Sequence, residues 1–254
     1  MHRISSFLKA TGILRIFILL FIPLLLEPSS FWGAANRIAI GKFTTGKEAD
    51  GSPKGWKTVT YFNTSPTSYQ VVKDRDKYVL KAEGIGTSSS LFKEVEADLN
   101  DYPIISWRWK ISNVIRQAIE TREDRNDSSA RVIVVFRSQP EEISLWYGLE
   151  YLFQKITRRN EPVGPRIEYI WGNKIQKGLM VDNPSVNHSK VIVVESGEEK
   201  ANRWIREKRN LLDDYRAAFG IDPKGILGLG IQTDTDQSNE GVTVFYGEIF
   251  LRRK

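Results

Sequence analysis

The chain has 254 residues with no cysteine and two histidines, and its 37 Lys and Arg residues outnumber its 31 Asp and Glu residues. Without cysteine, the protein cannot form a disulfide, a thiolate metal site or a cysteine nucleophile. His2 lies in the N-terminal segment, which leaves His188 alone in the folded part and excludes a zinc site built from histidines. Basic and acidic residues interleave along the chain, so no basic face and no nucleic-acid partner are expected.

Residues 1–35 have the composition of a secretory signal peptide. Three basic residues and no acidic residue precede Glu27, and the apolar run at 16–26 is shorter than the roughly 20 residues of a membrane span. Small residues at 33–35 predict cleavage after Ala35, which lowers the net charge from +6 to +4 by removing three bases and one acid. We therefore expect a periplasmic or secreted protein; the aromatic residues at 31–32 leave an uncleaved anchor as the alternative.

Residues 36–254 are expected to form a single β-sandwich domain. Short runs of strand-forming residues recur along this part of the chain, and turn residues such as Asp50-Gly51-Ser52-Pro53 separate them. The predicted strands are Trp56–Phe62, Tyr69–Lys73, Tyr78–Glu83, Leu91–Val95, Pro103–Lys110, Arg131–Arg137, Arg166–Trp171, Lys190–Glu195, Ile226–Gln232 and Val242–Leu251. Their number and spacing predict a mainly β fold, an antiparallel β-sandwich or jelly roll of the galactose-binding-like kind.

Two segments have helical periodicity instead. Residues 196–219 place Trp204, Leu211 and Tyr215 on one stripe, with Gly220 as a stop. Residues 141–159 carry apolar residues at i, i+3 and i+4, with acids at the start and bases at the end. The second helix, which contains Trp146, either packs on the sheet, or covers a cleft, or contacts a membrane surface.

Aromatic residues alternate along two predicted strands and form the candidate ligand site. Trp107 and Trp109 share one face of their strand, and Tyr169 and Trp171 share one face of another. These rings either line a platform that stacks on a sugar, or they fill the core. The candidate ligand-binding residues are Trp107, Arg108, Trp109, Arg131, Glu168, Tyr169 and Trp171.

Other polar and glycine residues suggest further sites. Asp124, Asp127 and Arg131 flank the entry to a strand and form a possible polar cluster at one end of the sandwich. Gly228 and Gly230 share one strand face, so either the Trp204 helix or a ligand is expected to approach the backbone there.

The loop between the last two predicted strands is a candidate metal site. Asp234, Asp236 and Asn239 alternate with other residues there, and their oxygens suit a hard cation such as a structural Ca²⁺. The alternative is a solvated turn, and the loop lacks the glycine and distal glutamate of an EF-hand.

No catalytic set is recognisable. His188 has no G-x-S-x-G partner, and the chain contains neither a P-loop nor a dinucleotide fingerprint. Glu168 and Asp234 are a conceivable glycosidase pair, although any chain this rich in acids offers such pairs.

Several segments in a fixed order resemble one bacterial family. They are residues 102–110 with the W-R-W-K sequence, 124–136, 169–173, 204–220, and 232–236 with the D-T-D sequence. Their order is similar to that of the exported family known as domain of unknown function 3047. The resemblance implies a periplasmic or secreted protein with a sandwich related to carbohydrate-binding modules, and it implies no established activity. The Trp146 helix departs from this pattern as an elaboration.

Three functional hypotheses follow. The first is a non-catalytic binding module of the cell envelope that engages a glycan or a similar polar ligand. The second is a hydrolase that acts on polysaccharide through paired carboxylates such as Glu168 and Asp234. The third is an assembly or scaffold protein that docks an envelope protein through the 141–159 helix.

Overall fold

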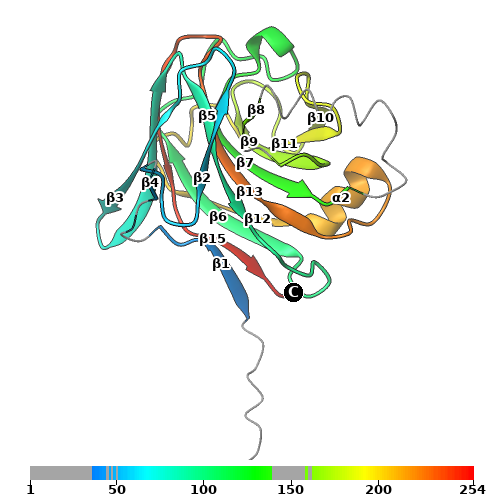
Figure 1. The fold of residues 1–254 in the computed structure, drawn as a ribbon. Helices are drawn as coiled ribbons and strands as arrows, with labels where there is room; N and C mark the ends of the chain where they lie inside the picture. The colour runs from blue at the N-terminus through cyan, green and yellow to red at the C-terminus, as the bar shows by residue number, and fades with distance from the viewer. Residues whose placement is uncertain (1–35, 44–45, 47, 50, 139–157, 160–161) are drawn as a thin grey trace, which may run out of the picture. The chain divides into compact units, whose positions relative to one another are not determined.

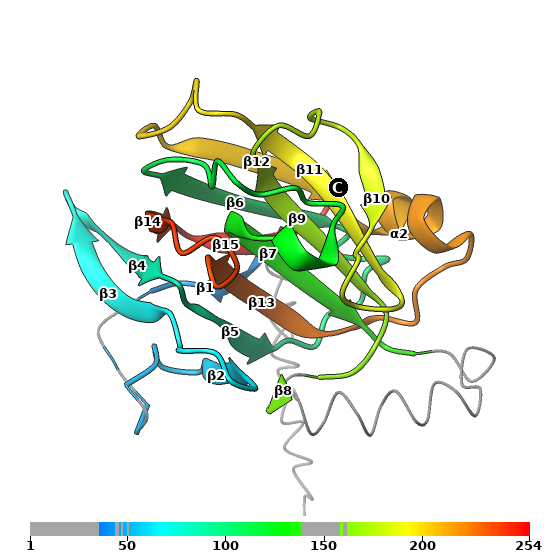
Figure 2. The same ribbon diagram turned by 90° about the horizontal axis from the view of Figure 1, so that it is seen from above.

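The strands assemble into two β-sheets that face each other, as the ribbon views show (Figures 1 and 2). The computed structural model describes residues 36–43, 46, 48–49, 51–138, 158–159 and 162–254. Residues Ala35–Lys254 form one compact unit. The mainly β fold predicted from the sequence is confirmed.

Sheet I has seven strands. Six follow the order β1-β15-β6-β14-β4-β3, and β12 pairs with β6. Because β12 pairs with β6 from Ile104 to Trp109, β14 and β15 lie end to end along the other edge of β6. The strands are β1 (Arg37–Gly41), β3 (Ser68–Asp74), β4 (Lys77–Ile85), β6 (Ile104–Ile111), β12 (Ile205–Asn210), β14 (Gly241–Tyr246) and β15 (Ile249–Arg252).

Sheet II has eight strands in the order β10-β11-β9-β7-β13-β5-β2-β8. One pair, β9 and β11, is parallel, which departs from the purely antiparallel sandwich that we expected. A parallel pair needs a long crossover, and residues 173–188 supply it. The strands are β2 (Lys57–Tyr61), β5 (Ser88–Glu94), β7 (Ser128–Phe136), β8 (Arg158–Arg159), β9 (Arg166–Gly172), β10 (Met180–Asp182), β11 (Ser189–Ser196) and β13 (Ile226–Asp234).

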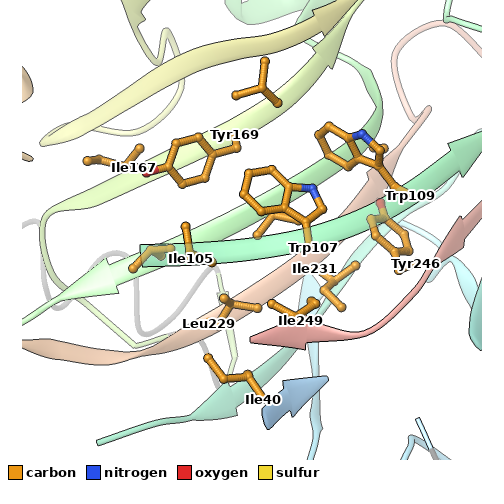
Figure 3. Packing of buried hydrophobic residues seen from close by; sticks show 14 of the residues in the cluster. Ile40, Ile105, Trp107, Trp109, Ile167, Tyr169, Leu229, Ile231, Tyr246 and Ile249 are labelled. Carbon is orange, nitrogen blue, oxygen red and sulfur yellow. The ribbon is translucent and has the colours of Figure 1, made fainter. Parts of the chain in front are cut away.

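The core lies between the two sheets and follows from the alternation of side chains. On β6, Ile105, Trp107, Trp109 and Ile111 are buried, whereas the residues between them are partly exposed. Figure 3 shows Trp107 and Trp109 on the same side of β6, with Tyr169 of β9 beside Trp107. The strand period of two therefore separates an apolar inner face of sheet I from a polar outer face.

The helix predicted over 196–219 is shorter than expected. Its second half forms α2 (Leu211–Phe219), whereas Ile205–Asn210 form strand β12. The Asn210 side chain accepts a hydrogen bond from the backbone N–H of Leu212 and caps the helix, and Gly220 ends it in the left-handed conformation at φ 76°. The segment forms a strand although its apolar residues have helical spacing. Pairing with β6 gives hydrogen-bond partners to the backbone groups of β12.

The second predicted helix, over 141–159, lies outside the described residues except for β8 at its end. Its roles as a membrane contact or a docking surface therefore stay predictions. In the described part of the chain, α2 is the one α-helix, accompanied by the 3₁₀ turn η1 (Glu123–Arg125). None of the helices described here has the length and hydropathy of a membrane span.

Neighbouring strands explain the two glycines of β13. A Cβ atom on Gly228 would lie 2.3 Å from the backbone oxygen of Lys93 and 2.4 Å from the Phe92 ring, both on β5. At Gly230 the nearest atom is Cβ of Ile133 on β7, at 3.3 Å. The close approach that the sequence predicts is real, but strand neighbours make it, not the Trp204 segment.

Candidate ligand-binding groove

The four aromatic residues predicted as a sugar platform lie in the core. Trp107 is 3% exposed, Trp109 and Tyr169 are 0% exposed, and Trp171 is 1% exposed. The ring centroids of Trp107 and Tyr169 are 5.3 Å apart, and those of Trp109 and Trp171 are 6.0 Å apart. An exposed platform is therefore wrong for these rings, because both sheets cover them. The alternative interpretation, that they fill the core, agrees with the structure.

The outer face of the same strand borders a groove. Ser106, Arg108 and Lys110 point away from the core, and Ser106 and Arg108 line a cavity of about 410 Å³ together with residues of β1, β12 and β15. The basic residues along this groove are Arg37, Lys77, Arg108, Arg206, Lys208 and Arg252. Of the seven residues predicted to bind a ligand, two line this surface cavity. They are Arg108, on the outer face of β6, and Trp107, on its inner face.

Aromatic rings hold several of these cations in place. The guanidinium carbon of Arg37 lies 4.5 Å from the centroid of the Phe250 ring, and that of Arg252 lies 5.4 Å from it. The guanidinium carbon of Arg108 lies 4.3 Å from the centroid of the Trp204 ring. Arginine stacked on an aromatic ring is oriented before any ligand arrives, which lowers the entropy cost of binding.

The two acidic residues of the groove neutralise little of this charge. Glu248 pairs with Lys77 at 3.4 Å, so these two charges cancel each other. Burial raises the pKa of Glu207 to about 7, although Lys177 lowers it. Glu207 lies opposite Trp107 in the pairing of β12 with β6, so its side chain is on the inner face of the sheet, and the outer face keeps the positive charge of its remaining arginines and Lys208.

The sequence analysis missed most of this groove and predicted no basic face. The groove residues come from strands β1, β4, β6, β12 and β15, which are far apart in the chain, so interleaved charges come together only in the fold. One local signal was present: Arg206 and Lys208 alternate at the spacing of a strand. The helix predicted for 196–219 concealed that alternation.

The structure also brings Arg131 and Glu168 together, as a buried ion pair on sheet II. Arg131 Nη1 donates to Glu168 Oε2 at 2.8 Å, and Glu168 Oε1 accepts from Asn183 and Ser189, each at 2.9 Å. Glu168 is 2% exposed. With both oxygens bonded and covered, this carboxylate cannot contact a polysaccharide, which argues against the paired-carboxylate hydrolase.

Two of the predicted metal ligands, Asp234 and Asp236, lie close to a third acidic residue, Asp127. One oxygen each from Asp127, Asp234 and Asp236 lie within 4.8 Å of one another. Asp127 was predicted to belong to a separate polar cluster with Asp124 and Arg131. The third predicted ligand, Asn239, donates its backbone N–H to the Thr235 oxygen at 3.1 Å, and its side-chain oxygen lies against Gly86.

Several solved structures are similar to this chain at low sequence identity. The chain is similar to the family 30 carbohydrate-binding module of a cellulosomal cellulase of Clostridium thermocellum, with a TM-score of 0.41, 11% identity, and coverage of 86% of this chain and 98% of that chain. It is also similar to the carbohydrate recognition domain of Emp47p, with a TM-score of 0.38, 10% identity, and coverage of 86% and 96%.

A third neighbour is an enzyme. The family 11 xylanase from Neocallimastix patriciarum matches with a TM-score of 0.32, 10% identity, and coverage of 86% of this chain and 93% of that chain. All three scores are below 0.5, so these similarities assign no function to this chain. A comparison with curated proteins gives no match.

The sequence itself identifies the family. The model of the family described as "protein of unknown function (DUF3047)" matches residues 54–250, most of the chain. This match confirms the resemblance drawn from the W-R-W-K and D-T-D segments. The chain therefore belongs to the DUF3047 family.

Proposed function

We propose that this protein is a non-catalytic module that binds an acidic glycan in the groove on the outer face of sheet I. The observation that carries the proposal is the charge of the groove. Four basic side chains without an acidic partner in the groove, Arg37, Arg206, Lys208 and Arg252, surround Arg108. A ligand that carries carboxylate or other anionic groups matches this charge.

The shape of the groove suits an extended polymer. It crosses the neighbouring strands β1, β15, β6 and β12, and four strands about 4.8 Å apart span roughly 14 Å. A chain of sugars laid across the strands would meet Arg37 at one side and Arg206 at the other. Arginine can bind each carboxylate with two parallel hydrogen bonds.

The predicted location supports a glycan as the ligand. Residues 1–35 read as a secretory signal, and we propose that the folded part acts in the periplasm or outside the cell. Acidic polysaccharides are accessible there, whereas intracellular nucleic acids are not. The aromatic residues contribute by orienting arginines, which differs from the sugar-stacking platform expected from the sequence.

A charge-matched pair of variants tests the proposal. R206Q/K208Q removes two exposed positive charges from β12, and K174Q/K224Q removes two exposed charges outside the groove. With polygalacturonate as the probe, in buffer without divalent cations, we expect the groove variant to bind roughly tenfold more weakly, at about 0.5–1 kcal/mol for each exposed ion pair lost. Calorimetric titration should show the control variant binding like the unmodified protein.

The same titration includes two comparison polymers. Fully methyl-esterified polygalacturonate has the same backbone without charge, and we expect it to bind at least tenfold more weakly. If both variants lost affinity equally, binding would depend on the net charge of the protein and not on the groove. A single-stranded DNA oligonucleotide that binds more tightly than polygalacturonate would contradict a glycan as the ligand.

A further inference from the structure

Three acidic residues from separate segments meet at one end of sheet II. Asp127 directly precedes β7, Asp234 is the last residue of β13, and Asp236 follows in the turn toward β14. Strands β7 and β13 are antiparallel neighbours, and Asp234 pairs with Ser128 across them. The start of β7 and the end of β13 therefore lie together, which explains why the three carboxylates converge within 4.8 Å.

The turn after β13 fixes the position of Asp127. The backbone N–H of Ser238 donates to Asp127 Oδ2 at 2.8 Å, and that of Gln237 donates to Asp127 Oδ1 at 3.3 Å. The backbone N–H of Thr235 in turn donates to the Thr87 oxygen at 2.9 Å. The Asp127 carboxylate is thus held by the backbone of the turn, and the turn is tied to Thr87.

Two carboxylate oxygens in this cluster are buried without a hydrogen-bond donor. Asp234 Oδ1 and Asp236 Oδ1 have no partner in the described structure, and Asp234 as a whole is 7% exposed. The other oxygens accept long bonds from Gln232 to Asp234 and from Thr64 to Asp236, each at 3.4 Å, and the Ser88 side chain also hydrogen-bonds to Asp234. A buried carboxylate oxygen without a hydrogen-bond partner is costly, and a bound cation would offset this cost for both atoms.

Neighbouring basic charge does not compensate the cluster. Arg131 acts on Asp234, but its guanidinium donates to Glu168 at 2.8 Å and to the Asn126 oxygen at 3.0 Å. The charge of Arg131 is thus shared with Glu168, and a bound cation would place further positive charge beside the three carboxylates.

The geometry points to a divalent-cation site, formed by Asp127, Asp234 and Asp236, that binds Ca²⁺. All the donors are oxygens, which hard cations prefer. Ca²⁺ accepts six to eight oxygens in irregular arrangements, whereas Mg²⁺ demands a near-ideal octahedron. Bound Ca²⁺ would tie the start of β7 to the end of β13 and to the turn that follows. The site belongs to sheet II and does not depend on the proposed groove in sheet I.

Calcium binding by the full chain is the direct test. After treatment with EDTA and exchange into chelator-free buffer at pH 7.5, titration with CaCl₂ should show one ion bound per chain. We expect 2 mM CaCl₂ to raise the Tm by several degrees, because a ligand that binds only the folded state stabilises it. Mg²⁺ at the same concentration should have a smaller effect. No calcium binding at 2 mM, or a larger effect of Mg²⁺, would overturn the assignment.

Isosteric variants locate the ion. In D236N we expect at least a tenfold loss of calcium affinity, together with a higher Tm than the unmodified protein in EDTA, because a repulsive charge is gone. D101N, which removes an exposed acid elsewhere, should bind calcium normally. Calcium affinity that is unchanged in D236N would place the ion elsewhere and overturn the proposal. If D236N does not fold, terbium luminescence of the unmodified protein, displaced by Ca²⁺, decides between one bound ion and none.

Discussion

Trp107 illustrates how a residue in the core can contribute stability while its neighbour in the strand lines the groove. Its ring is 3% exposed and packs against Trp109 and Tyr169, whereas Arg108 beside it reaches the groove. We expect Trp107→Ala to lower the free energy of unfolding by about 3–5 kcal/mol, the usual cost of deleting a buried large aromatic side chain. Urea denaturation followed by circular dichroism measures this loss.

Binding distinguishes this role of Trp107 from the sugar platform. At a temperature where Trp107→Ala remains folded, its affinity for polygalacturonate should stay within about twofold of the unmodified protein. A stability loss below 1 kcal/mol combined with lost binding would mean that the ring contacts the ligand after all.

Glu207 should make the stability of the protein depend on pH. Its ordinary pKa is 4.5, and burial raises the pKa of Glu207 to about 7 in the folded protein. Between these values the folded state holds a proton that the unfolded chain has released, so the free energy of unfolding falls as the pH rises from 4.5 to about 7. Lys177, which lowers this pKa, limits the effect.

The variant Glu207→Gln isolates this contribution. The stability of the unmodified protein minus that of the variant should decline by on the order of 2 kcal/mol between pH 4.5 and 7.5, after allowance for partial exposure. Urea unfolding at several pH values gives the difference. A difference that stays constant would show that folding does not raise the pKa of Glu207, and one that grows as the pH rises would show that folding lowers this pKa.

At the scale of elements, the close packing of β13 against β5 predicts unequal effects of two similar substitutions. Gly228→Ala would place a Cβ atom 2.3 Å from a backbone oxygen, which cannot move without shifting β5. Gly230→Ala would meet the Ile133 side chain at 3.3 Å, which requires only a small adjustment. We expect a loss of at least 2–3 kcal/mol for the first and below about 1 kcal/mol for the second.

Thermal unfolding of the two glycine variants checks this order. Both change the same residue type on the same face of one strand, so each controls for the other. Equal losses would mean that β13 and β5 lie farther apart than described.

Strand positions could be predicted from the sequence because side-chain alternation is local. All ten predicted runs contain strands, although Val242–Leu251 is divided at Gly247 and Glu248 into β14 and β15. The alternation of Arg206 and Lys208 did not suffice to predict strand β12, because Ile205–Asn210 continue into a helix and share its apolar spacing. Pairing with β6, a contact distant in the sequence, decides the conformation.

The candidate sites required the fold for the same reason. The D-T-D segment indicated oxygen donors, but Asp127 joins them only through the pairing of β7 with β13. The W-R-W-K segment indicated an aromatic strand, but its alternation does not say which side faces the second sheet. Arg131 and Glu168, both expected at a ligand site, instead complete a buried ion pair.

At the scale of the molecule, aromatic, basic and acidic side chains gather in three different places of the sandwich. Aromatic side chains fill the space between them, basic side chains collect on the outer face of sheet I, and acidic side chains collect at one end of sheet II. Raising the ionic strength from about 0.1 M to about 1 M shortens the screening length from about 10 Å to about 3 Å. Binding of an acidic polymer to the groove should weaken steeply over that range, and an affinity independent of salt would argue against ionic recognition.

The most direct measurement of the central claim maps the ligand onto the backbone. Titration of the isotope-labelled protein with short oligogalacturonates, followed by amide NMR shifts, reports every strand at once. We expect the largest shifts at Arg37, at Ser106–Arg108, at Arg206–Lys208 and at Phe250–Arg252, which all border the groove. Shifts confined to sheet II, or no shifts at millimolar ligand, would contradict binding of an acidic glycan on the outer face of sheet I.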